Sequence, residues 1–271
     1  MSIIIPQYDY EVVTGWFIQD APGDVVELPK SFGLIDTSDD GWTKIKQFLY
    51  KVNIEDREPG TIHKLFFLGR HGQGWHNVAE TKYGTAEWDR HWSKLNGDGE
   101  LVWGPDAELT SLGIQQADEI NAMWIEETKR GIPTPDVLYM SPLRRAIHTG
   151  VLSFDGWFYP NNTDPGMEAS NAVARLVLEA DFPFLLFENG FVEVDPTWTA
   201  DHRETPDEQD VRSRRALDKM FTADGTYISV SSHSGTMASI FRVIGHRPYA
   251  VNPGGVVPVL VRAKQKKKPI V

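Results

Sequence analysis

The sequence predicts an α/β fold, a three-layer sandwich in which helices flank a central, mostly parallel sheet. Short apolar runs recur along the chain, each ends in polar or charged residues, and helical patterns follow them. These runs cover residues 63–69, 137–140, 184–187 and 227–230. The alternation of strand, polar tip and helix is typical of a sheet whose parallel strands are joined by helices.

The amino-terminal residues 1–60 are rich in proline, glycine and aspartate and predict one helix, over residues 42–52. Its apolar residues share one face, and Asp39 or Asp40 is placed to cap its amino end. The Pro59-Gly60 pair then interrupts the chain before the first strand.

Residues 79–108 carry many aromatic and charged side chains without a helical or strand period, which predicts an insertion that runs over the sheet. A helix is well marked from its cap at Thr110 and ends near residues 131–133. The strand at 137–140 follows, and Pro142 suits the first turn of the next helix.

Two further strands complete the predicted sheet. The strand at 184–187 ends at Glu188, and the strand at 227–230 leads through His233 into a helix over 236–244. The basic residues 264–268 predict a solvated tail. Because no linker divides the chain, we expect a single domain over residues 1–271, with the extension 1–60 and the insertion 79–108.

The composition narrows the classes of function. The formal net charge is -11, which disfavours nucleic acid or an anionic membrane as the main partner. The absence of cysteine excludes thiol catalysis and disulfides. No run approaches the roughly 20 apolar residues that a membrane helix needs. We therefore expect a cytoplasmic protein, with the nucleus as a second location; the sequence leaves its oligomeric state open.

The side chains at the strand ends predict the chemistry. Arg70 and His71 end the first strand, Arg145 follows the second, Glu188 ends the third, and His233 follows the fourth. If the strands are parallel neighbours, these side chains meet at one edge of the sheet, where ligands bind in open α/β folds. Arginines and histidines gathered at one point repel each other unless they hold an anion or a carboxylate. The pattern therefore predicts a site for a phosphorylated small molecule.

Other sites fit the sequence less well. His71 and His76 could ligate a metal, but they lie five residues apart rather than the four that place two histidines on one helical face. Gly69, Gly72 and Gly74 resemble a phosphate-binding loop, yet no Gly-Lys-Ser/Thr follows. The serines beside His233 lack the Gly-x-Ser-x-Gly pattern of a hydrolase. A metal site, a nucleotide-binding loop and a serine nucleophile are thus disfavoured.

Four sequence blocks resemble the histidine phosphatase superfamily, branch 1, which includes the cofactor-dependent phosphoglycerate mutases. The Arg-His-Gly signature lies in residues 68–77, and the helix start lies in the Asp-x-x-Leu-Thr-x-x-Gly-x-x-Gln-Ala block at 106–117. The second-arginine block is 141–149 and the second-histidine block is 232–235. The resemblance implies a phosphoglycerate mutase-like fold. The amino-terminal extension resembles that of the phosphoglycerate mutase-like phosphatases of fungi and plants.

The resemblance also implies roles for the site residues. His71 corresponds to the nucleophile that becomes phosphohistidine, and Arg70, Arg145 and His233 correspond to the groups around the phosphoryl group. Arginine matches phosphate oxygens with a fixed fork of donors and stabilises the charge that spreads over them. Gly72 and Asn77 correspond to further substrate contacts. His71 must be neutral to attack, so we expect a backbone acceptor to fix its tautomer.

The resemblance also implies a proton donor, although the sequence departs from the family pattern at one position beside it. The family places a glutamate after an arginine, and Glu193 aligns with it, but Val192 stands where the arginine is usual. We expect Glu193 to protonate the leaving oxygen and then to activate water. Glu188 is the alternative donor.

The expected reaction is hydrolysis of a small phosphorylated metabolite without metal or cofactor, because the chain departs from the mutases near the donor glutamate. A cofactor-dependent phosphoglycerate mutase and a non-catalytic phosphate-binding module are the alternatives. Trp88, Trp92, Trp103 and Trp198 either line the mouth of the site, favouring a larger or apolar leaving group, or simply pack together.

Overall fold

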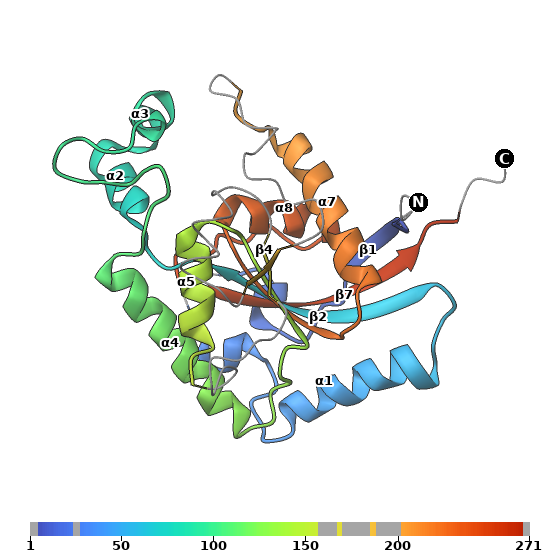
Figure 1. Ribbon diagram of the computed structural model, residues 1–271. Helices are drawn as coiled ribbons and strands as arrows, with labels where there is room; N and C mark the ends of the chain where they lie inside the picture. The colour runs from blue at the N-terminus through green and yellow to red at the C-terminus, as the bar shows by residue number, and fades with distance from the viewer. Residues whose placement is uncertain (1–4, 24–27, 157–166, 170–184, 188–201, 268–271) are drawn as a thin grey trace.

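The computed structural model describes residues 5–23, 28–156, 167–169, 185–187 and 202–267. Within them a mixed sheet has seven strands in the order β1-β7-β2-β6-β3-β4-β5 (Figure 1). The pairs from β2 through β6, β3 and β4 to β5 are parallel, whereas β7 runs antiparallel to both β1 and β2. The strands are β1 (Tyr8–Val12), β2 (Thr61–Arg70), β3 (Val137–Met140), β4 (Met167–Ala169), β5 (Leu185–Phe187), β6 (Tyr227–Ser232) and β7 (Val256–Gln265).

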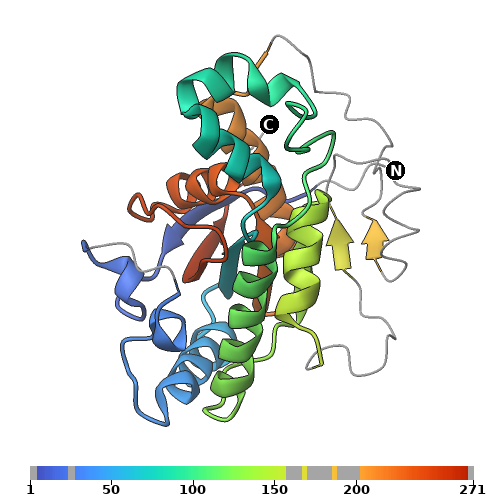
Figure 2. The same ribbon diagram turned by 90° about the vertical axis from the view of Figure 1, so that its left-hand side faces the viewer.

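Helices cover both faces of the sheet, as Figures 1 and 2 show. Helices α1, α4 and α5 pack on one face, and α7 and α8 pack on the other. The pair α2 and α3 projects from the carboxyl edge of the parallel strands (Figure 1). The helices are α1 (Gly41–Tyr50), α2 (Trp75–Tyr83), α3 (Thr85–Arg90), α4 (Ser111–Thr128), α5 (Arg144–Ser153), α7 (Pro206–Thr222) and α8 (Ser234–Ile244). No described helix combines the length and apolar character needed to cross a membrane.

Strand β2 joins the two hydrophobic cores. Leu65 and Phe67 belong to the core beneath α1, α4 and α5, whereas Phe66 and Leu68 belong to the core beneath α7 and α8. A strand buried on both faces reads as a continuous apolar run, because successive side chains point to opposite faces. That is why residues 65–68 could be recognised as a strand from the sequence.

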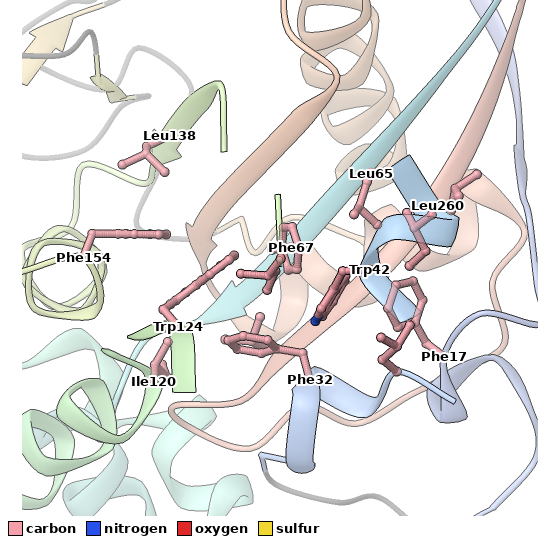
Figure 3. Packing of buried hydrophobic residues seen from close by; sticks show 14 of the residues in the cluster. Phe17, Phe32, Trp42, Leu65, Phe67, Ile120, Trp124, Leu138, Phe154 and Leu260 are labelled. Carbon is pink, nitrogen blue, oxygen red and sulfur yellow. The ribbon is translucent and has the colours of Figure 1, made fainter. Parts of the chain in front are cut away.

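The amino-terminal segment contributes to the first core. Figure 3 shows Phe32 and Trp42 facing Phe67 of β2, with Trp124 of α4 beside them. Below this cluster the buried Glu127 carboxylate accepts hydrogen bonds from Trp42 Nε1 at 2.7 Å and Ser31 Oγ at 2.9 Å. A buried carboxylate must be fully paired, so these donors attach the amino-terminal segment to α4.

Most of the predicted elements are confirmed, with boundaries shifted by a few residues. β3 has the predicted bounds, β2 and β6 extend beyond theirs, and α8 begins two residues earlier than predicted. Thr110 caps α4 by accepting from Gly113 N at 3.1 Å. Residues 185–187 form β5, whereas Phe184 lies outside the described residues.

Three local predictions are wrong. Pro142 precedes α5, whose first residue is Arg144, instead of lying in its first turn. Asp40 occupies the position before α1 without a capping hydrogen bond from its side chain. Lys264 is part of β7, where it forms an ion pair with Glu58, so the basic segment is not wholly a solvated tail. The prediction of a solvated tail was wrong there because the lysines follow directly on the apolar residues of β7, so that the sequence pattern did not indicate where the strand ends.

Trp42 provides a test of the amino-terminal packing. The Trp42→Ala variant should lose about 3–5 kcal/mol of unfolding free energy, because a fully buried indole leaves a cavity. Trp42→Phe should lose about 1–3 kcal/mol, because it keeps most of the volume but removes one donor to the buried Glu127. Urea denaturation measures both changes. The free energy of unfolding of Tyr50→Ala, at an exposed position of the same helix, should stay within about 0.5 kcal/mol of the wild type. A loss as large as that of Trp42→Ala would contradict the role of Trp42 in the core.

Candidate active site

The loop after β2 is anchored by backbone hydrogen bonds on both sides. His71 N donates to Ser232 O of β6 at 2.9 Å, and Gly254 N, just before β7, donates to His71 O at 3.1 Å. Arg70 N donates to Gly255 O at 2.9 Å. The central position of β2 in the sheet therefore fixes the backbone of both Arg70 and His71.

A close contact between two glycines holds the loop against the start of α4. A Cβ at Gly72 would lie 2.3 Å from Gly113 O, and a Cβ at Gly113 would lie 2.1 Å from Gln73 O. Only residues without a Cβ permit this approach. Gln73 N also donates to Gln116 Oε1 at 2.8 Å, and Thr110 N donates to Gln73 O at 2.9 Å. The 106–117 block thus clamps the loop that carries His71.

The His71 ring is held in one tautomer. Its Nδ1 lies 2.7 Å from Gly72 O, and because a carbonyl only accepts, Nδ1 carries the hydrogen. Nε2 therefore keeps its lone pair and accepts from Arg145 Nε at 3.3 Å. The side chain is almost completely buried. This confirms the backbone acceptor expected from the sequence and leaves Nε2 as the ring nitrogen without a hydrogen.

Two more imidazoles flank His71. The rings of His76 and His233 each lie 5.1 Å from the His71 ring, measured between centroids. His233 Nε2 lies 2.7 Å from Ser141 Oγ, at the end of β3. His76 comes from the first turn of α2. The three imidazole rings therefore lie together at the carboxyl ends of β2 and β6.

Two arginines from different elements lie near these rings. Arg70 ends β2 and donates from Nη1 to Val251 O at 2.8 Å. Arg145 lies in the first turn of α5, and its Nη1 is 3.6 Å from Asp106 Oδ1. Asp106 also accepts from Arg144 N at 2.9 Å, so one carboxylate orients both the helix start and the guanidinium. These contacts direct Arg145 toward His71.

Burial and positive charge keep the imidazoles neutral. Burial first, and then Arg145, lower the pKa of His71 to about 3. The same two causes lower the pKa of His76 to about 2 and that of His233 well below its ordinary value. Burial raises the pKa of Asp106. A site of neutral imidazoles and cationic guanidinium groups favours an anion, which would relieve the repulsion among them.

The structure brings together four of the residues predicted for the site, Arg70, His71, Arg145 and His233. Asn77 lies in the first turn of α2, where its Oδ1 accepts from Gly74 N at 3.0 Å. Glu188 and Glu193, the two predicted proton donors, lie outside the described residues, as does Trp198.

Sequence reasoning missed two members of the site. His76 was considered only as a metal ligand, although its place in α2, five residues after His71, turns it back toward that ring. Asp106 stood in a recognised block without a role, because its ion pair with Arg145 joins segments far apart in the chain. In the described part of the chain, no group of three or more histidine, aspartate or glutamate side chains is arranged to hold a metal ion.

A cavity of about 420 Å³ lies on the side of the insertion, and it is linked to the site by Asp106, which lines it and lies 3.6 Å from Arg145 Nη1. Trp75, Val102, Trp103 and Asp106 are among the residues that line it. Tyr83, Trp88 and Trp92 are not among the lining residues and instead pack around Trp103, which belongs both to their aromatic cluster and to the cavity lining. Trp88 and Trp92 therefore fit the packing alternative, whereas Trp75 was not considered as a lining residue from the sequence.

The chain is similar in sequence to a known protein family. Residues 66–251 match the family model described as histidine phosphatase superfamily (branch 1). A protein of Arthroderma benhamiae described as "Probable phosphoglycerate mutase" is 36% identical over an alignment of 290 positions that covers 96% of this chain and 86% of the relative.

Two further similarities are more distant. "Phosphomutase-like protein 3" of Candida albicans is 34% identical over 73% of this chain and 65% of its own length. A solved structure described as "Mycobacterial hydrolase 1" covers 76% of this chain and 97% of its own, with 16% identity and a TM-score of 0.44. The family model spans well over half of the chain and includes both the arginine-histidine loop and the second histidine. The chain therefore belongs to branch 1 of the histidine phosphatase superfamily.

Proposed function

We propose that this chain is a metal-independent phosphatase that hydrolyses a small phosphorylated metabolite through a phosphohistidine formed on His71. The observation that carries the proposal is the His71 ring, whose Nδ1 hydrogen is committed to Gly72 O while Nε2 keeps its lone pair beside Arg145. A neutral imidazole with its nucleophilic nitrogen next to a guanidinium can attack a phosphorus atom that the same guanidinium helps to bind.

The residues around His71 suit each part of the transfer. Nε2 attacks phosphorus, and the bond between phosphorus and the ester oxygen breaks. Arg70, Arg145 and His233 bind the phosphoryl oxygens, whose charge spreads as the bond to the leaving group lengthens. Arg145 now donates to Nε2 at 3.3 Å, so phosphate binding must draw its guanidinium toward the phosphoryl oxygens and release the lone pair. Gly72 and Asn77 complete the proposed substrate contacts.

The proposed proton donor is Glu193, on the strength of the resemblance. The glutamic acid protonates the leaving oxygen, and the resulting carboxylate takes a proton from the water that attacks phosphohistidine. Phosphate then leaves and His71 regains its neutral state. Glu188 is the alternative donor.

A second candidate function is that of a mutase. The descriptions of the fungal relatives as a phosphoglycerate mutase and a phosphomutase-like protein favour it. Transfer back to a sugar acid would replace transfer to water, with the same phosphohistidine. A non-catalytic binding module would keep the anion pocket, but it gives no reason for the fixed tautomer of His71.

A panel of phosphate monoesters tests the proposal, with phosphate release measured beside a bisphosphate-primed mutase assay. We expect the wild type to release phosphate and His71→Ala to lose more than about a thousandfold in rate, because the nucleophile is gone. His91→Ala, an exposed histidine, is the matched control and should retain full activity. Undiminished phosphate release by His71→Ala would refute the phosphohistidine, and turnover confined to the primed assay would establish the mutase.

The role of Glu193 as proton donor is tested by comparing substrates with poor and good leaving groups. Glu193→Gln should slow the hydrolysis of an alkyl phosphate by about a hundredfold or more, because an alkoxide leaves poorly without a proton. An activated aryl phosphate should be slowed far less. Steady-state rates on both esters give the comparison, and equal slowing would point to Glu188 as the donor instead.

The neutral histidines predict a pH dependence of stability. The unfolded chain protonates histidine near pH 6.5, whereas folded His71 has a pKa of about 3, so the unfolded state binds more protons between these values. The free energy of unfolding should be at its full value above pH 6.5 and fall as the pH is lowered toward 3. Urea denaturation at about pH 7 and about pH 5 measures this fall.

A variant isolates the part of that fall due to His71. His71→Asn should flatten the dependence by up to about 1.4 kcal/mol per pH unit, since one neutral histidine is removed. Identical slopes in the wild type and the variant would show that His71 titrates normally in the folded state.

A further inference from the structure

We propose that the cavity beside the phosphate pocket receives the leaving group of the substrate, and that it selects leaving groups with an apolar face and without negative charge. Monoesters of neutral alcohols, amino alcohols and phenols are then preferred over monoesters of carboxylated alcohols. This inference rests on the proposed phosphatase function and adds the class of substrate.

The cavity begins one side chain away from the nucleophile. Asp106, which lines it, lies 3.6 Å from Arg145 Nη1, and Arg145 Nε lies 3.3 Å from His71 Nε2. On the other wall, Trp75 begins α2 and is held by its backbone N–H, which donates to Glu108 O at 3.1 Å. A phosphoryl group on His71 would therefore have its ester substituent close to this cavity.

One wall of the cavity is apolar. Trp75 is 38% exposed and Val102 is 71% exposed, whereas Trp103 beside them is only 4% exposed. The other aromatic rings of the insertion pack against each other, with Tyr83 and Trp92 stacked at 3.9 Å between centroids. Exposed aromatic and aliphatic surface in a concave site is what an apolar part of a ligand contacts. Trp75 is thus available to a ligand in a way that the packed aromatic residues are not.

The charged residues of the lining are all acidic. Glu100, Asp106 and Glu108 line the cavity, and none of its lining residues in the described part of the chain is a lysine or an arginine. The neighbouring cations are paired with carboxylates. Lys82 binds Asp98 and Glu100, and Arg144 lies 3.8 Å from Glu108.

The site around His71 and the cavity therefore have opposite preferences for the charge of a ligand. The pocket around His71 attracts the phosphoryl group with guanidinium groups, whereas the cavity repels a second negative charge. The carboxylates that line the cavity oppose a second negative charge there, although solvent weakens the effect of the exposed Glu100 and Glu108. A substrate that fits both sites is anionic at its phosphate end and neutral or cationic at the other.

Matched competitors test this selectivity in the full chain, with an activated aryl phosphate as the reporter substrate. Phosphoethanolamine and phosphoserine differ by one carboxylate. We expect phosphoethanolamine to inhibit reporter hydrolysis at a roughly threefold to tenfold lower concentration than phosphoserine. The double variant Glu100→Gln, Glu108→Gln should bring that ratio toward one. Glu119→Gln, an exposed carboxylate of α4 remote from the cavity lining, should leave the ratio unchanged.

The apolar wall is tested in the same assay. Trp75→Ala should raise KM for the aryl phosphate severalfold while changing inhibition by phosphoethanolamine much less, because only the aryl ring needs the indole. Equal inhibition by the two competitors in the wild type, or a ratio unaltered in the double variant, would overturn the selectivity. If reporter hydrolysis depends on His71, such a result refutes only the proposed selectivity of the cavity. Reporter hydrolysis that does not depend on His71 refutes the proposed phosphatase mechanism as well.

Discussion

Positive charge held out of water at one edge of the sheet is the constraint on which the rest of this structure depends. Arg70 and Arg145 share a buried corner with His71, and desolvation together with their charge keeps the imidazole neutral. A buried cation without a partner is costly, so Asp106 is placed against Arg145. Among the described residues, Asp106 beside Arg145 and the charge of Glu80 acting on Arg70 offset part of the charge that the two guanidinium groups bring. The remaining positive potential favours an anion.

The 106–117 block has a structural role that its position in the chain does not suggest. It spans the end of the insertion and the first turns of α4, and it supplies both the carboxylate beside Arg145 and the backbone contact between Gly72 and Gly113. The His71 loop and Arg145 are therefore positioned by the same segment. The two halves of the site also meet directly, because Arg145 Nε donates to His71 Nε2 and Gly72 N donates to Thr149 Oγ1 of α5.

The sequence predicted those parts of the fold and site that local signals encode. Apolar runs ending in charged residues marked β2, β3 and β6, and the parallel order of these strands brought Arg70, His71 and His233 together. The pairing of strands that lie far apart in the chain could not be predicted from local sequence patterns. β7 is an apolar strand whose end is masked by lysines, and its antiparallel place between β1 and β2 depends on partners distant in the chain. The ion pair of Asp106 was missed for the same reason.

The place of β7 has a consequence for the order in which the molecule can be completed. Among the described strands, β1 near the amino end pairs only with β7, and the residues just before β7 hydrogen-bond the backbone of Arg70 and His71. During synthesis β1 therefore has no partner strand until residues 256–265 are made, and the His71 loop lacks these backbone hydrogen bonds until then. Such non-local pairings are slow to form and leave strand edges open meanwhile. The site around His71 is thus among the last parts of the nascent chain to acquire its final geometry.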